Sequence, residues 1–228
     1  MIKNDTAILF FSRSATAEAA AKPLSTNPRS AKSVASFLIN RSKKVVSKTD
    51  LPTFFFSEKQ QRGTTFGERF ANAFEDVFAL GFERVIAIGN DCLTVNTSDI
   101  LVAENALKTT PSVFGATTDG GAYLIGLQRV VFQKTAFQHL DWQTNNVFNQ
   151  LVQFVENQGA PPVFLSEKSD INHAADWQKV LPKVALFIQK TIARLLQIGV
   201  SIASKNSVFP INHRFLTASL ALRAPPVF

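Results

Sequence analysis

Residues 84–92 read Arg-Val-Ile-Ala-Ile-Gly-Asn-Asp-Cys, and this stretch decides the class of fold. The run at residues 84–88, which is apolar after Arg84, is typical of a buried strand of a parallel sheet, and Gly89 ends it. Asp91 follows just past the carboxyl end of that strand, at the edge where open α/β sheets bind ligands. A carboxylate there can bind Mg²⁺ or Mn²⁺ together with a substrate phosphate, or it can cap a helix or close a turn. Both interpretations stay open from this stretch alone.

Short apolar runs and amphipathic segments alternate on both sides of this strand, which predicts an α/β domain with a parallel sheet. A polar loop rich in Ser and Ala is expected directly after the first strand. Further strands are expected at residues 7–11, 53–56, 112–117, 122–127 and 161–165. Helices are expected at residues 31–48, 66–80, 98–107, 144–158, 173–181 and 184–203.

The tripeptide Asp119-Gly120-Gly121 lies between two of the expected strands and predicts a hairpin turn. Two glycines also let the backbone approach a ligand closely. The aspartate beside them could accept hydrogen bonds from sugar hydroxyls or bind a metal ion. Because an ordinary hairpin turn also favours Asp-Gly, the turn by itself has both a structural and a functional interpretation.

Composition excludes several classes of protein. Of the 228 residues, 46% are hydrophobic and 18% are charged, which excludes a disordered chain and a coiled coil. We expect one domain over residues 1–204 and a tail over residues 205–228 that packs on its surface. A single cysteine, Cys92, excludes zinc ribbons and iron–sulfur clusters, because those sites need several thiolates. We expect Cys92 to be a small buried side chain. The low cysteine count indicates a reducing compartment, the cytoplasm. The Gly-rich and nucleophile-elbow motifs of P-loop NTPases, NAD dehydrogenases and serine hydrolases do not occur.

The net charge of +7 is concentrated in the first 50 residues and favours phosphate-bearing ligands. No nucleic-acid-binding motif accompanies it, so no nucleic-acid partner is expected. The apolar stretch at residues 184–203 contains Lys190 and Arg194, which makes a membrane span costly. We expect an amphipathic helix on the core there, with peripheral membrane contact as the less favoured alternative.

Several motifs, taken in order, resemble one family. Residues 61–70 read Gln-Arg-Gly-Thr-Thr-Phe-Gly-Glu-Arg-Phe and resemble its Q-x-G-x-x-L-G-E-R-M. Residues 89–92 resemble its G-S-D-C-P, residues 119–126 its D-G-G-Y-Y-L-I-G, residues 142–144 its W-x-T, and residues 170–176 its D-x-D-T-x-x-D. The family is that of the bacterial glycosyltransferase-like proteins described as radical-SAM/selenodomain-associated transferases. The resemblance covers most of residues 5–180.

This resemblance implies a nucleotide-diphospho-sugar transferase (GT-A-like) fold, a three-layer sandwich around a mostly parallel sheet, related to molybdenum-cofactor nucleotidyltransferases and phospholactate guanylyltransferase. It also implies a divalent cation, Mg²⁺ or Mn²⁺, and a nucleotide-diphospho-sugar or nucleoside triphosphate as the substrate. By motif position, the implied catalytic residues are Asp91 and Asp119, and the implied metal ligands are Asp91, Asp170 and Asn172. The implied nucleotide- and phosphate-binding residues are Arg13, Lys22 and Arg69, and the implied substrate-binding residues are Gly120, Gly121, Trp142 and Thr144.

The first loop departs from the family pattern. The family reads roughly F-x-R-x-P-x-x-G-x-x-K-T-R-L, whereas residues 11–24 keep Arg13 but have Glu18 at the glycine position and Lys22 shifted by one. A glutamate near phosphates is repulsive, so weaker nucleotide affinity or an unusual donor is expected. Three hypotheses follow: transfer of a sugar from a nucleotide-diphosphate donor to a small or lipid-like acceptor, nucleotidylyl transfer to a phosphorylated acceptor, and a non-catalytic binding protein.

Overall fold

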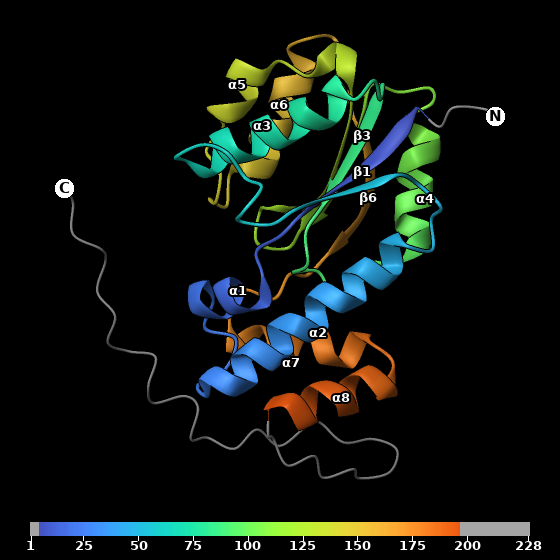
Figure 1. The fold of residues 1–228 in the computed structure, drawn as a ribbon. Helices are drawn as coiled ribbons and strands as arrows, with labels where there is room; N and C mark the ends of the chain where they lie inside the picture. The colour runs from blue at the N-terminus through green and yellow to red at the C-terminus, as the bar shows by residue number, and fades with distance from the viewer. Residues whose placement is uncertain (1–4, 197–228) are drawn as a thin grey trace.

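The computed structural model describes residues 5–196, which form an α/β fold around one six-stranded sheet (Figure 1). The strand order is β2-β1-β3-β5-β4-β6, and β5 alone of these six runs antiparallel to its neighbours. The predicted α/β class with a mostly parallel sheet is therefore confirmed. The strands are β1 (Thr6–Phe11), β2 (Thr53–Phe56), β3 (Arg84–Ile88), β4 (Ser112–Thr117), β5 (Ala122–Gln128) and β6 (Val163–Lys168).

The central strands are apolar on both faces because helices cover both sides of the sheet. In β1, Ala7 and Leu9 belong to one buried cluster, whereas Ile8 and Phe10 belong to the cluster on the opposite face. This alternation follows from the two-residue period of a strand. A run without polar residues is therefore what these strands require.

Helices form the two outer layers of the sandwich (Figure 1). One face carries α3 (Phe66–Ala79), α5 (Lys134–Gln138) and α6 (Val147–Glu156), and the other carries α2 (Pro28–Val46) and α4 (Thr97–Ala106). The short α7 (Trp177–Val180) and α8 (Leu186–Leu196) pack with α2 in a third cluster. Single 3₁₀ turns lie at Arg129–Val131, Ala174–Asp176 and Leu181–Lys183.

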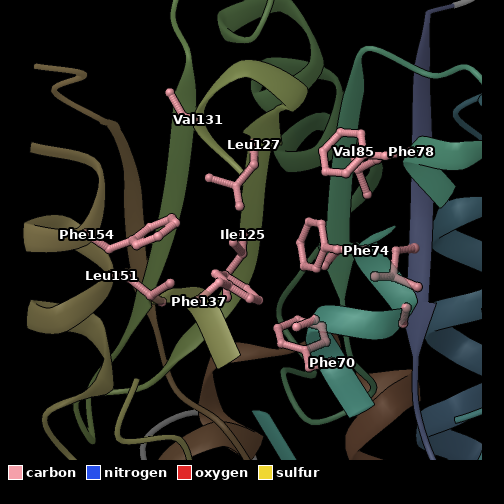
Figure 2. Close-up of a cluster of buried hydrophobic side chains, with 14 of the residues drawn as sticks. Phe70, Phe74, Phe78, Val85, Ile125, Leu127, Val131, Phe137, Leu151 and Phe154 are labelled. Atoms are coloured by element: carbon pink, nitrogen blue, oxygen red, sulfur yellow. The ribbon is translucent and has the colours of Figure 1, made fainter. Parts of the chain in front are cut away.

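An aromatic core lies between the sheet and the α3 layer. Figure 2 shows Phe70, Phe74 and Phe78 of α3 directed towards β3 and β5, with Phe137 next to them and Phe154 of α6 on the far side of Phe137. Ring centroids such as those of Phe74 and Phe137 are 5.2 Å apart in an edge-on arrangement, which aromatic quadrupoles favour. At the start of α3, a Cβ on Gly67 would lie 2.0 Å from the Gln138 carbonyl oxygen, so only glycine allows this close approach.

The first loop differs from its expected form. Residues expected to form a polar loop instead contain the helix α1 (Ala15–Ala21), so that prediction was wrong. Ser14 caps this helix by accepting a hydrogen bond from the Ala17 amide, and the alanine-rich sequence favours helix. The short α5 was also missed. The tail predicted for residues 205–228 and the end of the helix predicted at residues 184–203 lie outside the described residues. Across residues 5–196, no helix has both the length and the apolar character that a membrane span needs.

Candidate active site

A cleft of about 440 Å³ opens at the edge of the sheet where five of the six strands end. Its walls come from the loops after β1 and β3, the hairpin turn between β4 and β5, the start of α3, and the segments before α6 and after β6. The cleft brings together ten of the eleven predicted site residues, and Gly120 lies in the hairpin turn next to it. They are Arg13, Lys22, Arg69, Asp91, Asp119, Gly121, Trp142, Thr144, Asp170 and Asn172.

A chain of alternating charges forms one side of the cleft. The Lys22 ammonium lies 2.6 Å from Asp91 Oδ2 and 3.1 Å from Glu18 Oε1. Arg13 reaches the other oxygen of Glu18 at 3.4 Å. The Glu18 side chain is only 3% exposed, so this is a mostly buried ion network and not a solvated surface pair. The two cations predicted to bind phosphate are therefore already paired with carboxylates of the chain itself.

These contacts set the ionisation of the network. Burial acts to raise the pKa of Glu18, but Lys22 and Arg13 outweigh it, so the pKa is lowered and Glu18 is a carboxylate. Burial acts to lower the pKa of Lys22, but Asp91 and Glu18 outweigh it and raise that pKa. At Asp91 burial prevails over the attraction of Lys22 and raises the pKa. The ammonium of Lys22 thus holds two carboxyl groups together.

Asp170 lines the same cleft as this network. The backbone amide of Ile171 donates to the Asp91 carbonyl oxygen at 3.0 Å, which ties the loop after β3 to the segment after β6. Asp91 Oδ1 and Asp170 Oδ1 are both buried, and neither has a hydrogen-bond partner within the described part of the chain. Buried polar atoms are rarely left without a partner, so two such oxygens fit a site that a cation completes.

The protein alone supplies an incomplete ligand set for a metal ion. Over residues 5–196, no group of three or more His, Cys, Asp or Glu residues could hold one. Mg²⁺ is commonly bound by one or two carboxylates, with water and substrate phosphates as the other ligands. The Asp91 and Asp170 oxygens fit that arrangement.

The Asp170 carboxyl should make stability depend on pH. Burial, then the negative charges of Asp91 and Asp119, raises the pKa of Asp170 to about 8. A raised pKa means that the folded state disfavours the charged form of this acid. The resulting loss in the free energy of unfolding begins as the pH rises past about 4 and is complete above about pH 8. We expect Asp170→Asn in EDTA to unfold at a temperature several degrees higher than the wild type at pH 8.5, and at nearly the same temperature at pH 4. A constant difference across this range, measured by calorimetry, would contradict this assignment.

The hairpin turn has a structural role that the sequence left open. Asp119 Oδ1 accepts hydrogen bonds from the Thr117 hydroxyl at 2.5 Å and the Gly121 backbone amide at 3.3 Å, and its Oδ2 accepts from the side-chain amide of Asn172 at 3.1 Å. Gly120 has φ of +86°, and its carbonyl oxygen accepts from the Phe148 amide at the start of α6. The turn therefore holds the hairpin, the segment after β6 and α6 together beside the cleft.

Aromatic side chains line the opposite side of the cleft. Trp142 packs on Phe66 and Phe70 with centroid distances of 5.6 and 5.2 Å, and its indole N–H donates to the Phe137 carbonyl oxygen. Arg69 donates to the Thr64 carbonyl oxygen at 2.8 Å. The Thr144 hydroxyl donates to the Asp141 carbonyl oxygen and accepts from the Asn146 amide. These three residues line the cleft while also stabilising its wall, and their substrate-binding roles stay predictions.

The structure adds residues that motif reasoning did not place in the site. Phe11, Gln61 and Phe66 line the aromatic side of the cleft. Glu58 accepts hydrogen bonds from the amide and the hydroxyl of Ser14 at 2.6 and 2.7 Å and so closes the first loop. Gln61 and Phe66 stand inside the quoted motif of residues 61–70 and could have been found there, whereas no local pattern marks Glu58.

Comparison with solved structures identifies the fold. A candidate nucleotide-diphospho-sugar transferase from Desulfovibrio desulfuricans G20 matches with a TM-score of 0.74 and 19% identity over 85% of this chain and 94% of that chain. Rv0371c from Mycobacterium tuberculosis H37Rv matches with a TM-score of 0.48 and 11% identity over 80% of this chain and 100% of that chain. The bifunctional IspDF from Campylobacter jejuni matches with a TM-score of 0.48 and 13% identity over 76% of this chain and 53% of that chain. The first of these confirms the expected fold.

Sequence comparison gives the family of the chain. No curated protein matches the chain. The predicted association with radical-SAM or selenoprotein systems stays a prediction. Residues 31–144, half of the chain, match the family described as "Uncharacterized protein conserved in bacteria (DUF2064)", and the chain belongs to that family.

Proposed function

We propose that this protein is a metal-dependent transferase that moves a sugar from a nucleotide-diphosphate donor to a small or lipid-like acceptor. The observation that carries the proposal is a pair of buried oxygens, Asp91 Oδ1 and Asp170 Oδ1, that find no hydrogen-bond partner within residues 5–196 and lie in a cleft that also contains Arg13 and Lys22. Cations facing carboxylates at the edge of an α/β sheet favour a phosphate-bearing ligand bound through a divalent ion. The description of the D. desulfuricans protein, whose fold this chain shares, agrees with the proposal.

Different residues of the cleft have different roles in this proposal. Asp91 and Asp170 would hold Mg²⁺ or Mn²⁺, and the bound ion would stabilise the negative charge of the leaving diphosphate. Lys22 binds Asp91 Oδ2, and Asp91 Oδ1 has no hydrogen-bond partner among residues 5–196, so it is available to a cation. Arg13 is 36% exposed at its side chain and can contact a phosphate from the solvent side.

The acceptor would lie between the hairpin and the aromatic wall. Trp142 and Phe66 offer apolar area there, and Asp119 offers carboxylate oxygens. In the transfer, the bond between the sugar and the diphosphate breaks, a bond from the sugar to the acceptor oxygen forms, and the acceptor loses a proton. Asp119 is our candidate for taking that proton, although three hydrogen-bond donors already contact it.

A nucleotide screen by thermal shift tests the proposal. With Mn²⁺ present, we expect one nucleoside diphosphate to raise the melting temperature by about 5–10 °C at a concentration one hundred times its Kd. The shift should vanish in EDTA. Incubation with the matching nucleotide-sugar should release a nucleoside diphosphate, whereas release of pyrophosphate from a nucleoside triphosphate would establish nucleotidylyl transfer instead. If no nucleoside diphosphate shifts the transition with Mn²⁺ present, the proposal is wrong.

A further inference from the structure

We infer that Glu18 is a specificity-determining residue that makes the cleft select a nucleotide-diphosphate ester over a nucleoside triphosphate. The inference rests on the proposed function and separates its two enzymatic versions, since sugar transfer consumes the ester and nucleotidylyl transfer consumes the triphosphate. A buried carboxylate stands between the two cations best placed to bind phosphate.

The charges that line the cleft nearly cancel. Among the described residues its lining includes three cationic side chains, those of Arg13, Lys22 and Arg69, and four carboxyl groups. The formal charge is therefore −1 when all are ionised, and +1 with one divalent cation bound. The four carboxyl groups are those of Glu18, Asp91, Asp119 and Asp170.

The candidate ligands differ mainly in phosphate charge. A nucleotide-diphosphate ester carries about −2, because both of its phosphates are esterified, whereas a terminal phosphate adds about −1.5 to −2 by itself. A nucleoside triphosphate therefore brings about −4 to a cleft whose net charge with one cation is +1. The ester leaves a small imbalance and the triphosphate leaves a large one.

Glu18 is positioned so that a phosphate bound by Arg13 and Lys22 lies close to its negative charge. Its carboxylate is held from both sides, by Lys22 at 3.1 Å and by Arg13 at 3.4 Å, and its side chain is 3% exposed. Salt screens buried charges far less than exposed ones, so each additional phosphate charge is repelled at close range. The Glu18 carboxylate thus neutralises positive charge of Arg13 and Lys22 that would otherwise attract one more phosphate charge.

A series of inorganic phosphates tests the inference without requiring knowledge of the base. Orthophosphate, pyrophosphate and tripolyphosphate are titrated by calorimetry at a fixed free Mg²⁺ concentration into the wild type, Glu18→Gln and the control Glu75→Gln. Glu75 pairs with Lys134 at 2.7 Å on the exposed surface of α3, so the control makes the same chemical change away from the cleft. Circular dichroism checks folding, and Glu18→Ala, which keeps a good helix former, replaces the glutamine variant if that one fails to fold.

We expect wild-type affinity to vary by less than about threefold across the series, and Glu18→Gln to bind tripolyphosphate at least about tenfold more tightly than the wild type does. Orthophosphate affinity should change little, and Glu75→Gln should match the wild type throughout. A wild-type affinity that already rises tenfold or more along the series, with the same rise in Glu18→Gln, would overturn the inference. The inference would also be overturned if none of the three phosphates bound to the wild type or to Glu18→Gln.

If the phosphate series behaves as expected but no nucleotide binds with Mn²⁺, the proposed function fails and the role of Glu18 stands. If Mn²⁺-dependent nucleotide binding is found but the phosphate affinity of both the wild type and Glu18→Gln stays constant along the series, the role of Glu18 is wrong and the proposed function stands.

Discussion

Asp91→Asn should lower the Mn²⁺-dependent affinity for the nucleotide ligand by about 100-fold or more, because even residues that only support metal ligands commonly contribute 10- to 100-fold. The asparagine keeps the volume of the side chain and one oxygen but removes the negative charge that a divalent cation requires. Lys22 keeps its contact with Glu18 in this variant, so the first loop retains a partner for the ammonium. Isothermal calorimetry of nucleotide binding, with Mn²⁺ and with EDTA, measures the effect.

A matched control separates this effect from a general loss of charge. Asp76→Asn removes a carboxylate that pairs with Arg62 on the surface of α3, where the two side chains are 37% and 62% exposed. Exposed pairs of this kind contribute little, so this variant should bind as the wild type does. If Asp91→Asn binds equally well too, the metal role assigned to Asp91 is wrong and the non-catalytic hypothesis gains support.

Lys22→Met should destabilise the protein by about 3–5 kcal/mol, because it leaves the buried charge of Glu18 and the partly buried charge of Asp91 without their shared cation. For a chain of this size the melting temperature should fall by roughly 10 °C. Methionine fills most of the space of the lysine stem, so a cavity is not the cause. Chemical and thermal denaturation followed by circular dichroism measure the loss.

Lys108→Met is the control for this change. Lys108 also pairs with a glutamate one helical turn earlier, Glu104 at 3.1 Å, but its side chain is 49% exposed. This variant should lose less than about 1 kcal/mol.

The pH dependence adds a second check on Lys22→Met. The lowered pKa of Glu18 stabilises the wild type above its ordinary value of 4.5, and the raised pKa of Lys22 does so below 10.5. The difference between Lys22→Met and the wild type should therefore be full between about pH 6 and 10 and shrink as the pH falls below about 4. Equal losses at Lys22 and Lys108, or a loss that ignores pH, would contradict the buried network.

Much of the fold could be predicted because its strands carry local signals. The strands at residues 53–56 and 84–88 have the predicted bounds, since each is a compact apolar run that polar residues or glycine end. The antiparallel pairing of β4 with β5 was predicted from Asp119-Gly120-Gly121, and Gly120 indeed has positive φ. Gly81, predicted to end α3, also has positive φ, +93°, and donates to the Phe78 carbonyl oxygen.

The site was predicted less completely because its contacts join distant parts of the chain. Motif order placed Asp91 and Asp170 in one site, and the structure brings them into one cleft through the Ile171–Asp91 backbone bond. Glu18 was expected to repel phosphate, but its pairing with Lys22 depends on α1, whose seven residues carry too little periodicity to be recognised as a helix. Cys92, predicted to be a small buried side chain, is 6% exposed, and burial raises the pKa of its thiol to about 11.

Trp142 gives the molecule an optical probe at the place where it is most useful. The chain has two tryptophans, and the other, Trp177, is 4% exposed and donates to the Leu24 carbonyl oxygen behind the first loop. The indole of Trp142 instead borders the cleft and is anchored to the Phe137 carbonyl oxygen. Filling the cleft should therefore alter the emission of one indole and leave the other as an internal standard, so ligand entry can be followed in real time without attaching a dye.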